Sequence, residues 1–124
     1  MKTAVIVYSD PKNGSEESLG RVFNALAATY DFKQQGDDVT LLFQGAGTRW
    51  VGELSKQDHP AHELYQAVLD KVAGVSCGCA AVFGATAEVE KQGLELIKGN
   101  PVPGTSGLPS LRKLVSDGYT ILNF

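Results

Sequence analysis

Two continuous apolar runs separated by a helical repeat constrain the fold of this chain most strongly. Residues 4–8 and 39–43 are short and rich in aliphatic and β-branched side chains, the pattern of strands that are covered on both faces. Between them, apolar residues recur with helical spacing: Leu19, Val22, Phe23, Leu26, Ala27 and Tyr30. A strand, a helix and a strand in this order predict a right-handed crossover between parallel strands.

The helix between the two runs has start and stop signals. Asn13 or Ser15 can cap its first turn, where Glu16 and Glu17 favour the positive end of the helix. Gly36 is placed to end it. We expect residues 4–8 to form the central strand of the sheet.

The rest of the chain alternates in the same way. Further helices are expected to start at Thr48, at residues 58–60 and at Pro109, and a last strand at residues 119–124. The helix from residues 58–60 should present Leu64, Val68 and Val72 on one face and continue to Gly74.

The segment between these elements is less regular. Residues 86–97 are expected to be mostly helical, although residues 94–97 could instead form a short strand. Residues 99–107 form a loop of proline and glycine. Together these patterns predict a doubly wound α/β fold, with a mainly parallel sheet of four or five strands flanked by helices.

Length and composition narrow the class of protein. A chain of 124 residues corresponds to one domain, residues 1–124. Its 43% hydrophobic residues and formal net charge of -3 indicate an ordinary soluble protein that does not bind nucleic acid. The first apolar run is too short for a signal peptide or a membrane span, so we expect a cytoplasmic protein with no membrane contact. Thiols in that compartment stay reduced.

Both cysteines of the chain lie in one segment, residues 75–84, where they flank Gly78. If a buried strand ends over residues 75–77 and a helix begins at Ala80, Cys77 and Cys79 occupy a strand-to-helix turn. Free N–H groups and the positive helix end would favour a thiolate there. Two alternatives stay open: the cysteines are small core side chains, or a strand over residues 79–83 puts them at its N-terminal end.

Ligands of open α/β sheets bind outside the carboxyl ends of the strands. The loops expected at that edge are residues 9–15, 44–48, 76–79 and 99–107. Their candidate binding residues are Asn13, Ser15, Gly45, Gly47, Thr48, Arg49 and Gly78. Glycines let backbone N–H groups approach an anion. Arg49 could pair with a thiolate or another sulfur anion, or it could be a solvated surface residue.

The sequence gives little support to a flavin site or to a zinc site. Residues 9–18 follow the first strand like a flavodoxin phosphate loop, but Asp10, Glu16 and Glu17 make the loop acidic, and these residues can simply cap a helix. His59 and His62 could join the cysteines as zinc ligands, but the spacing does not fit a zinc site. We therefore expect no metal and no organic cofactor.

The order of four segments resembles the DsrE/DsrF-like family, which includes the YchN-like proteins and sulfur-relay subunits of the TusBCD type. The segments are AVIVYSDP, VTLLFQG, the cysteine segment that ends in a glycine, and LRKLVSDGYTILNF. The resemblance implies a small α/β domain assembled into trimers or hexamers, with a cysteine that carries sulfur as a persulfide. Cys79, five residues before Gly84, resembles the second cysteine of the family's C-x-x-C pairs, although this chain has C-G-C.

The function predicted from these observations is a cytoplasmic sulfur relay, with a sulfurtransferase reaction at the cysteines. Cys79 would accept sulfur from a persulfide donor and pass it to an acceptor thiol, while Cys77 assists or resolves. The expected partners are further copies of the chain and a sulfur donor or acceptor protein. The alternatives are an oligomeric binding module with structural cysteines and, less favoured, a flavodoxin-like flavin protein.

Overall fold

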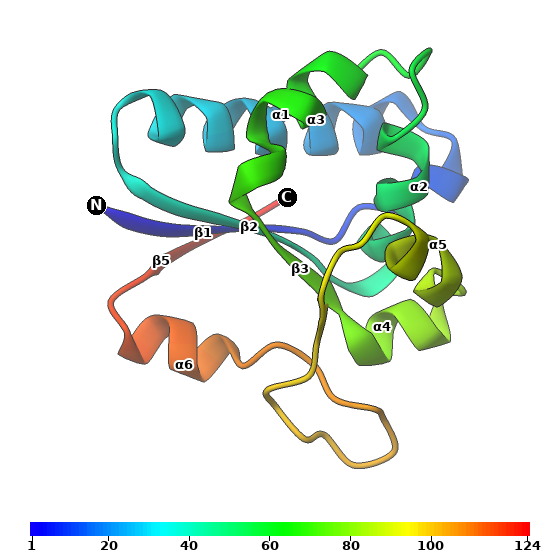
Figure 1. Ribbon diagram of the computed structural model, residues 1–124, viewed down its shortest axis with the longest axis vertical. Coiled ribbons are helices and arrows are strands. Elements are labelled where there is room, and N and C mark those ends of the chain that lie inside the picture. Colours follow the sequence, from blue (N-terminus) through cyan, green and yellow to red (C-terminus); the bar gives the residue numbers. More distant parts are fainter.

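The structure, a computed structural model, describes residues 1–124 and contains one sheet of five parallel strands (Figure 1). The strand order is β4-β3-β2-β1-β5. The strands are β1 (Lys2–Val7), β2 (Asp38–Phe43), β3 (Val72–Ser76), β4 (Leu96–Ile97) and β5 (Thr120–Asn123). The predicted doubly wound α/β fold with a parallel sheet is confirmed.

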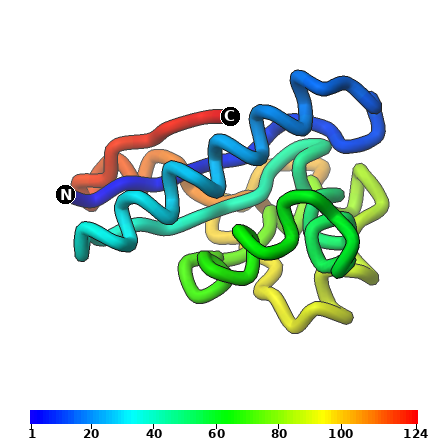
Figure 2. Tube along the Cα trace, turned by 90° about the horizontal axis from the view of Figure 1, so that it is seen from above, coloured from blue at the N-terminus to red at the C-terminus, as the bar shows by residue number.

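Helices cover both faces of the sheet. They are α1 (Glu16–Gln34), α2 (Trp50–Leu54), α3 (His62–Val68), α4 (Cys77–Val82), α5 (Thr86–Lys91) and α6 (Leu111–Ser116), with 3-10 turns η1 (Pro11–Asn13), η2 (Gly45–Arg49) and η3 (Leu69–Lys71). Figure 1 shows α1 and α3 on one face and α6 on the other. In Figure 2, α1 runs along β1 and β2.

The predicted first helix is confirmed with its caps. The Ser15 hydroxyl accepts a hydrogen bond from the Ser18 N–H at 3.1 Å, so Ser15 is the N-cap. α1 ends two residues before Gly36. Its Val22 and Leu26 are fully buried. They belong to the main core, which also contains the sheet residues Val5, Val7, Leu41, Phe43 and Val75, and each such side chain contributes about 1.5–3 kcal/mol by leaving water.

The prediction that residues 4–8 form the central strand is wrong. β2 is central, and β1 lies between β2 and β5. β1 is nevertheless buried along Thr3–Val7, because β5 pairs with its second edge. Burial on both sides of a strand therefore does not distinguish the central strand from its neighbour.

Several element boundaries differ from the prediction: α2 begins at Trp50 rather than at Thr48, and α3 begins at His62 rather than at residues 58–60. The helix expected to continue to Gly74 ends at Val68, and Val72 already belongs to β3. The four-residue spacing of apolar side chains continues across the 3-10 turn η3, so periodicity alone did not show the end of the helix. Within residues 86–97, the strand alternative is confirmed for Leu96–Ile97, because α5 ends at Lys91.

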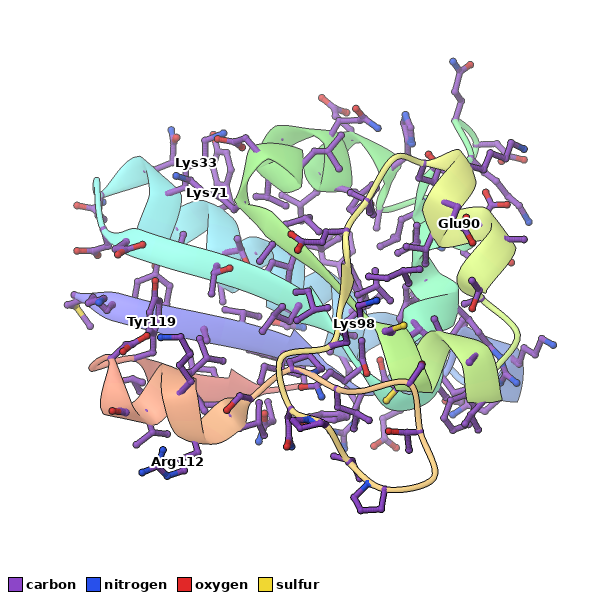
Figure 3. The ribbon with its side chains drawn as sticks, turned by 60° about the horizontal axis from the view of Figure 1, so that its bottom comes forward. Lys33, Lys71, Glu90, Lys98, Arg112 and Tyr119 are labelled. Atoms are coloured by element: carbon purple, nitrogen blue, oxygen red, sulfur yellow. The ribbon has the colours of Figure 1, made fainter.

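The second face of the sheet is covered by α6, the helix expected to start near Pro109. The Ser110 hydroxyl caps it by accepting a hydrogen bond from the Lys113 N–H at 3.2 Å. Figure 3 shows Arg112 on the outer side of this helix, directed away from the sheet. None of the helices combines the length and the apolar character that crossing a membrane requires.

Candidate functional site

The carboxyl ends of the three inner strands meet at one edge of the sheet, and the cysteines lie there. In the register of the sheet, Phe43 of β2 is level with Val7 of β1 and with Val75 of β3. One residue further on, β3 ends and α4 begins with Cys77, followed by Cys79 in the same turn. This edge is where open α/β sheets bind their ligands.

The predicted strand-to-helix turn is confirmed, with a helix that begins earlier than expected. α4 starts at Cys77 rather than Ala80, because the buried Ser76 caps it: the Ser76 hydroxyl accepts a hydrogen bond from the Cys79 N–H at 3.3 Å. The alternative with a strand over residues 79–83 is wrong, since Cys79–Val82 are helical.

Both thiols are free and partly exposed. Neither is enclosed in the core, unlike Gly78 between them and Ala80 after them. Residues two apart on a helix do not face each other, so Cys77 and Cys79 meet different surroundings. The Cys77 sulfur lies 3.2 Å from the Ser106 hydroxyl oxygen.

Cys79 shares its surroundings with Tyr8, the residue that follows β1. Partial burial raises the pKa of Tyr8, and the negative charge of a Cys79 thiolate raises it further. The Tyr8 hydroxyl donates a hydrogen bond to the Gln44 side-chain oxygen at 3.4 Å. Gln44 follows β2 and is buried. Residues from the ends of three adjacent strands therefore converge near Cys79.

The η2 turn, which packs against α4, contains four of the predicted binding residues: Gly45, Gly47, Thr48 and Arg49. A side chain on Gly47 would put its Cβ 2.3 Å from the Val7 carbonyl oxygen, so this glycine allows two backbones to pack closely. Gly45 lies beside the Tyr8 ring. The buried Thr48 hydroxyl donates to the Gly45 carbonyl at 2.9 Å and is used within the turn.

Arg49 is held by groups other than the thiols. Its guanidinium forms an ion pair with Asp10 at 3.1 Å, and its Nε donates to the Phe83 carbonyl at 3.0 Å. It also lies over the Phe83 ring. Arg49 is therefore neither a solvated surface residue nor a partner of a sulfur anion in this structure. It connects the loop after β1 to the residue that ends α4.

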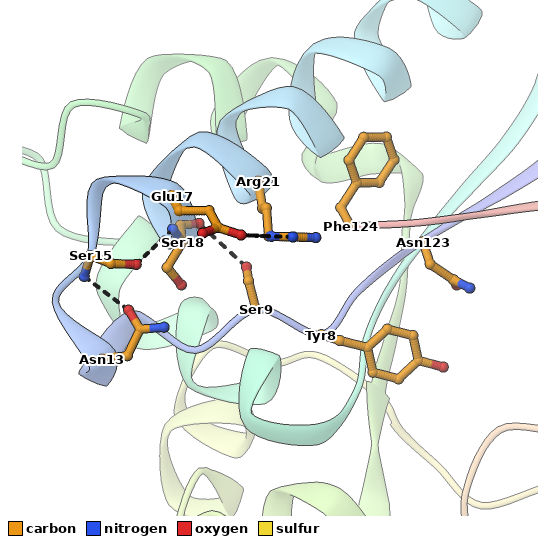
Figure 4. Close-up of a pocket in the computed structure, with 9 residues that line it drawn as sticks. All are labelled: Tyr8, Ser9, Asn13, Ser15, Glu17, Ser18, Arg21, Asn123 and Phe124. Atoms are coloured by element: carbon orange, nitrogen blue, oxygen red, sulfur yellow. Dashed lines mark hydrogen bonds and ion pairs between the residues drawn. The ribbon is translucent and has the colours of Figure 1, made fainter.

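Asn13 and Ser15 line an open pocket of about 370 Å³ that Tyr8 also lines (Figure 4). Their side-chain oxygens accept backbone N–H groups at the start of α1. The guanidinium in this pocket, Arg21, is paired with Glu17 at 2.8 Å. These contacts support the interpretation of the loop as a helix cap. The cysteines do not line this pocket.

Gly78 contributes to the cysteine site through backbone packing. Its N–H donates to the Gly107 carbonyl at 2.7 Å, which holds the loop of residues 99–107 against α4. Sequence reasoning placed that loop at the edge but did not single out Ser106. Tyr8 was assigned only to a strand and Gln44 only to a loop. The proximity of Tyr8 to Cys79 and the contact of Tyr8 with Gln44 depend on strand register, which periodicity does not encode.

The two histidines lie apart from the cysteines, at the start of α3. His59 Nδ1 accepts a hydrogen bond from the Ala61 N–H at 3.0 Å, and burial lowers the pKa of His59. His62 Nδ1 lies 2.8 Å from the Leu54 carbonyl oxygen. No group of three or more His, Cys, Asp or Glu side chains is arranged to hold a metal ion.

Comparison with known proteins agrees with this architecture. The chain is 25% identical over 123 residues to "Uncharacterized protein MJ0733" of Methanocaldococcus jannaschii, an alignment that covers 98% of this chain and 94% of the relative. No solved structure matches this chain. The sequence profile of the DsrE/DsrF-like family matches residues 1–124. The protein therefore belongs to the DsrE/DsrF-like family.

Proposed function

We propose that this protein is a small sulfur carrier, with sulfurtransferase activity, that receives sulfur on Cys79 as a persulfide and passes it to an acceptor thiol. The observation that carries the proposal is the position of Cys79. It is a free, partly exposed thiol at the carboxyl edge of the sheet, in a chain of the DsrE/DsrF-like family. Tyr8 lies at the same edge of the sheet, where the charge of a Cys79 thiolate raises the pKa of Tyr8.

The proposed transfer needs no oxidant or reductant. The Cys79 thiolate attacks the outer sulfur of a donor persulfide, R–S–SH. The donor's S–S bond breaks, the donor leaves as a thiolate, and Cys79 becomes Cys79–S–SH. An acceptor thiolate then attacks the outer sulfur of Cys79 and takes it, which regenerates the Cys79 thiolate. One S–S bond forms and one breaks in each step.

Cys77 has an assisting role in this proposal. Its sulfur contacts Ser106, whereas Cys79 lies near Tyr8. Because residues two apart on a helix diverge, joining both sulfurs in one disulfide requires the first turn of α4 to unwind. We therefore propose that sulfur leaves Cys79 to a partner protein and that Cys77 is a separately accessible second thiol.

The proposal places the protein in the cytoplasm, where thiols are kept reduced and available. Its partners are a sulfur donor, an acceptor protein and further copies of the chain, in the trimers or hexamers that the family resemblance implies.

The test is sulfur uptake by the folded, reduced protein. Incubation with a low-molecular-weight persulfide should add the mass of one sulfur atom, and fragmentation should assign that atom to Cys79. Removal of the donor and addition of an acceptor thiol should return the protein to its starting mass. A folded protein that takes up no sulfur, while the urea-unfolded chain does, would overturn the proposal and favour a binding module with structural cysteines.

A further inference from the structure

We propose that Ser106 is a positioning residue for the second thiol of the site: its hydroxyl donates a hydrogen bond to the Cys77 sulfur and favours the thiolate. This inference rests on the proposed function, because it assigns a role to the cysteine that assists Cys79. The direct contact is the 3.2 Å separation of the Cys77 Sγ and the Ser106 Oγ.

The loop that carries Ser106 is closed on itself. Asn100 and Leu108 form an antiparallel bridge, with N–H to carbonyl bonds of 2.7 and 3.0 Å in the two directions. Inside the loop, the Thr105 hydroxyl donates to the Val102 carbonyl at 2.7 Å and accepts from the Gly107 N–H at 3.1 Å. Ser106 therefore sits in a segment whose backbone is held by its own hydrogen bonds.

Two glycines allow this loop to pack closely, Gly78 of α4 against the loop and Gly107 against Lys98. A Cβ on Gly78 would lie 2.8 Å from Leu108 Cδ1, 3.0 Å from the Gly107 carbonyl oxygen and 3.2 Å from Thr105 Cβ. A Cβ on Gly107 would lie 2.6 Å from Lys98 Cβ, at a φ of +106° that L side chains rarely adopt. The Gly78 N–H to Gly107 carbonyl bond of 2.7 Å then fixes the loop one residue from Cys77.

The protonation state of Cys77 sets the direction of the hydrogen bond. In the thiol form either group can donate, but a thiolate has no proton, so only the Ser106 hydroxyl can. Hydrogen bonds to an ionised partner are stronger than neutral ones. The contact therefore stabilises the thiolate more than the thiol, which raises the fraction of Cys77 that can react.

The effect of the Ser106 hydroxyl on Cys77 must be distinguished from the effects of other ionisable groups nearby. They are Cys79 on α4 and Lys98 after β4, whose backbone lies against Gly107, whereas Tyr8 lies near Cys79. Figure 3 shows Lys98 beside the start of α4. Arg49 is paired with Asp10. Lys98 is thus the cation whose charge could act in place of the hydroxyl.

The experiment measures iodoacetamide labelling of the full chain against pH, with Cys77 and Cys79 distinguished by fragmentation. In Ser106→Ala, labelling of Cys77 at neutral pH should become about three- to tenfold slower, and its midpoint should move to higher pH. Ser106→Thr keeps the hydroxyl and should restore the profile. Gly78→Ala leaves Ser106 in place but pushes its loop away from α4, so it should also slow the labelling of Cys77.

Controls separate this role from a general loosening of the site. Ser116→Ala removes an exposed hydroxyl from α6 and should leave both profiles unchanged. A Cys77 profile unchanged in Ser106→Ala, an equal change at Cys79, or a shift in Lys98→Gln but not in Ser106→Ala would overturn the inference. Sulfur uptake on Cys79 is a separate readout, so a failure of the proposed function is recognised independently of the Cys77 profile.

Discussion

The Arg49 guanidinium binds the Asp10 carboxylate, with Nη1 3.2 and 3.1 Å from its two oxygens. Both side chains are largely covered, with 24% and 29% of their surfaces exposed. The same guanidinium donates to the Phe83 carbonyl at the end of α4. This arrangement joins the loop after β1, the η2 turn and the cysteine helix, and it leaves the thiols free of a nearby guanidinium partner.

We expect Arg49→Ala to lower the free energy of unfolding by about 1–3 kcal/mol, because it leaves Asp10 and the Phe83 carbonyl without their charged donor. Urea denaturation measures this change. The matched control is Lys56→Ala, which removes an exposed pair with Glu53 and should change stability by no more than about 0.5 kcal/mol. Equal losses in the two variants would contradict the structural role.

Two glycines should respond oppositely to alanine. Gly20 lies inside α1 with no atom near its missing side chain, so Gly20→Ala should stabilise the protein by about 0.5–1 kcal/mol. Gly47→Ala would press a Cβ against the Val7 backbone and should destabilise by about 1–3 kcal/mol. Thermal or urea unfolding of both variants checks the packing of η2 on β1. A Gly47→Ala protein as stable as the wild type would disprove this close approach.

Stability should fall steeply at alkaline pH because of Tyr65. Burial raises the pKa of Tyr65 from its ordinary 10.0 to about 12. Between pH 10 and 12 the folded protein keeps the Tyr65 proton, whereas the unfolded chain releases it. The contribution of Tyr65 to the free energy of unfolding is therefore fully present below pH 10 and is lost as the pH rises toward 12. The loss is about 1.4 kcal/mol per pH unit.

Tyr65→Phe isolates this contribution. The variant keeps the aromatic ring that packs edge-on against Phe43, with the two ring centroids 6.4 Å apart, but it has no titrating hydroxyl. The free energy of unfolding of the wild type should decline faster than that of Tyr65→Phe between pH 10 and 12. Parallel declines would show that the tyrosine is not buried as described.

The elements that could be predicted from the sequence are those whose own residues show an apolar pattern. β1 and β2 are continuous apolar runs, and α1 has regular spacing and a capping serine, so each was identified from local pattern. β4 has only two residues, Leu96 and Ile97, which is too short for a period to distinguish strand from helix. Strand order depends on long-range pairing, which explains why β1 was wrongly placed at the centre.

The candidate site was predicted only in part for a related reason. Cys77 and Cys79 carry a recognisable chemistry, and their position at a strand-to-helix turn followed from flanking patterns. Ser106 lies 29 residues from Cys77 in sequence, and its role depends on how a proline and glycine loop folds back. Arg49 was noted for its charge, but its partners Asp10 and Phe83 are set by tertiary packing.

The most direct measurement of the central claim is sulfur uptake in two matched variants, Cys79→Ser and Cys77→Ser, exposed to the same low-molecular-weight persulfide and read by intact mass. The account predicts that Cys79→Ser loses most of the sulfur uptake, because the carrier thiol is gone and only the assisting thiol of Cys77 remains. It predicts that Cys77→Ser still gains one sulfur atom, because the two thiols occupy different surroundings. Loss of uptake in Cys77→Ser with uptake retained in Cys79→Ser would contradict the assignment of Cys79 as the carrier.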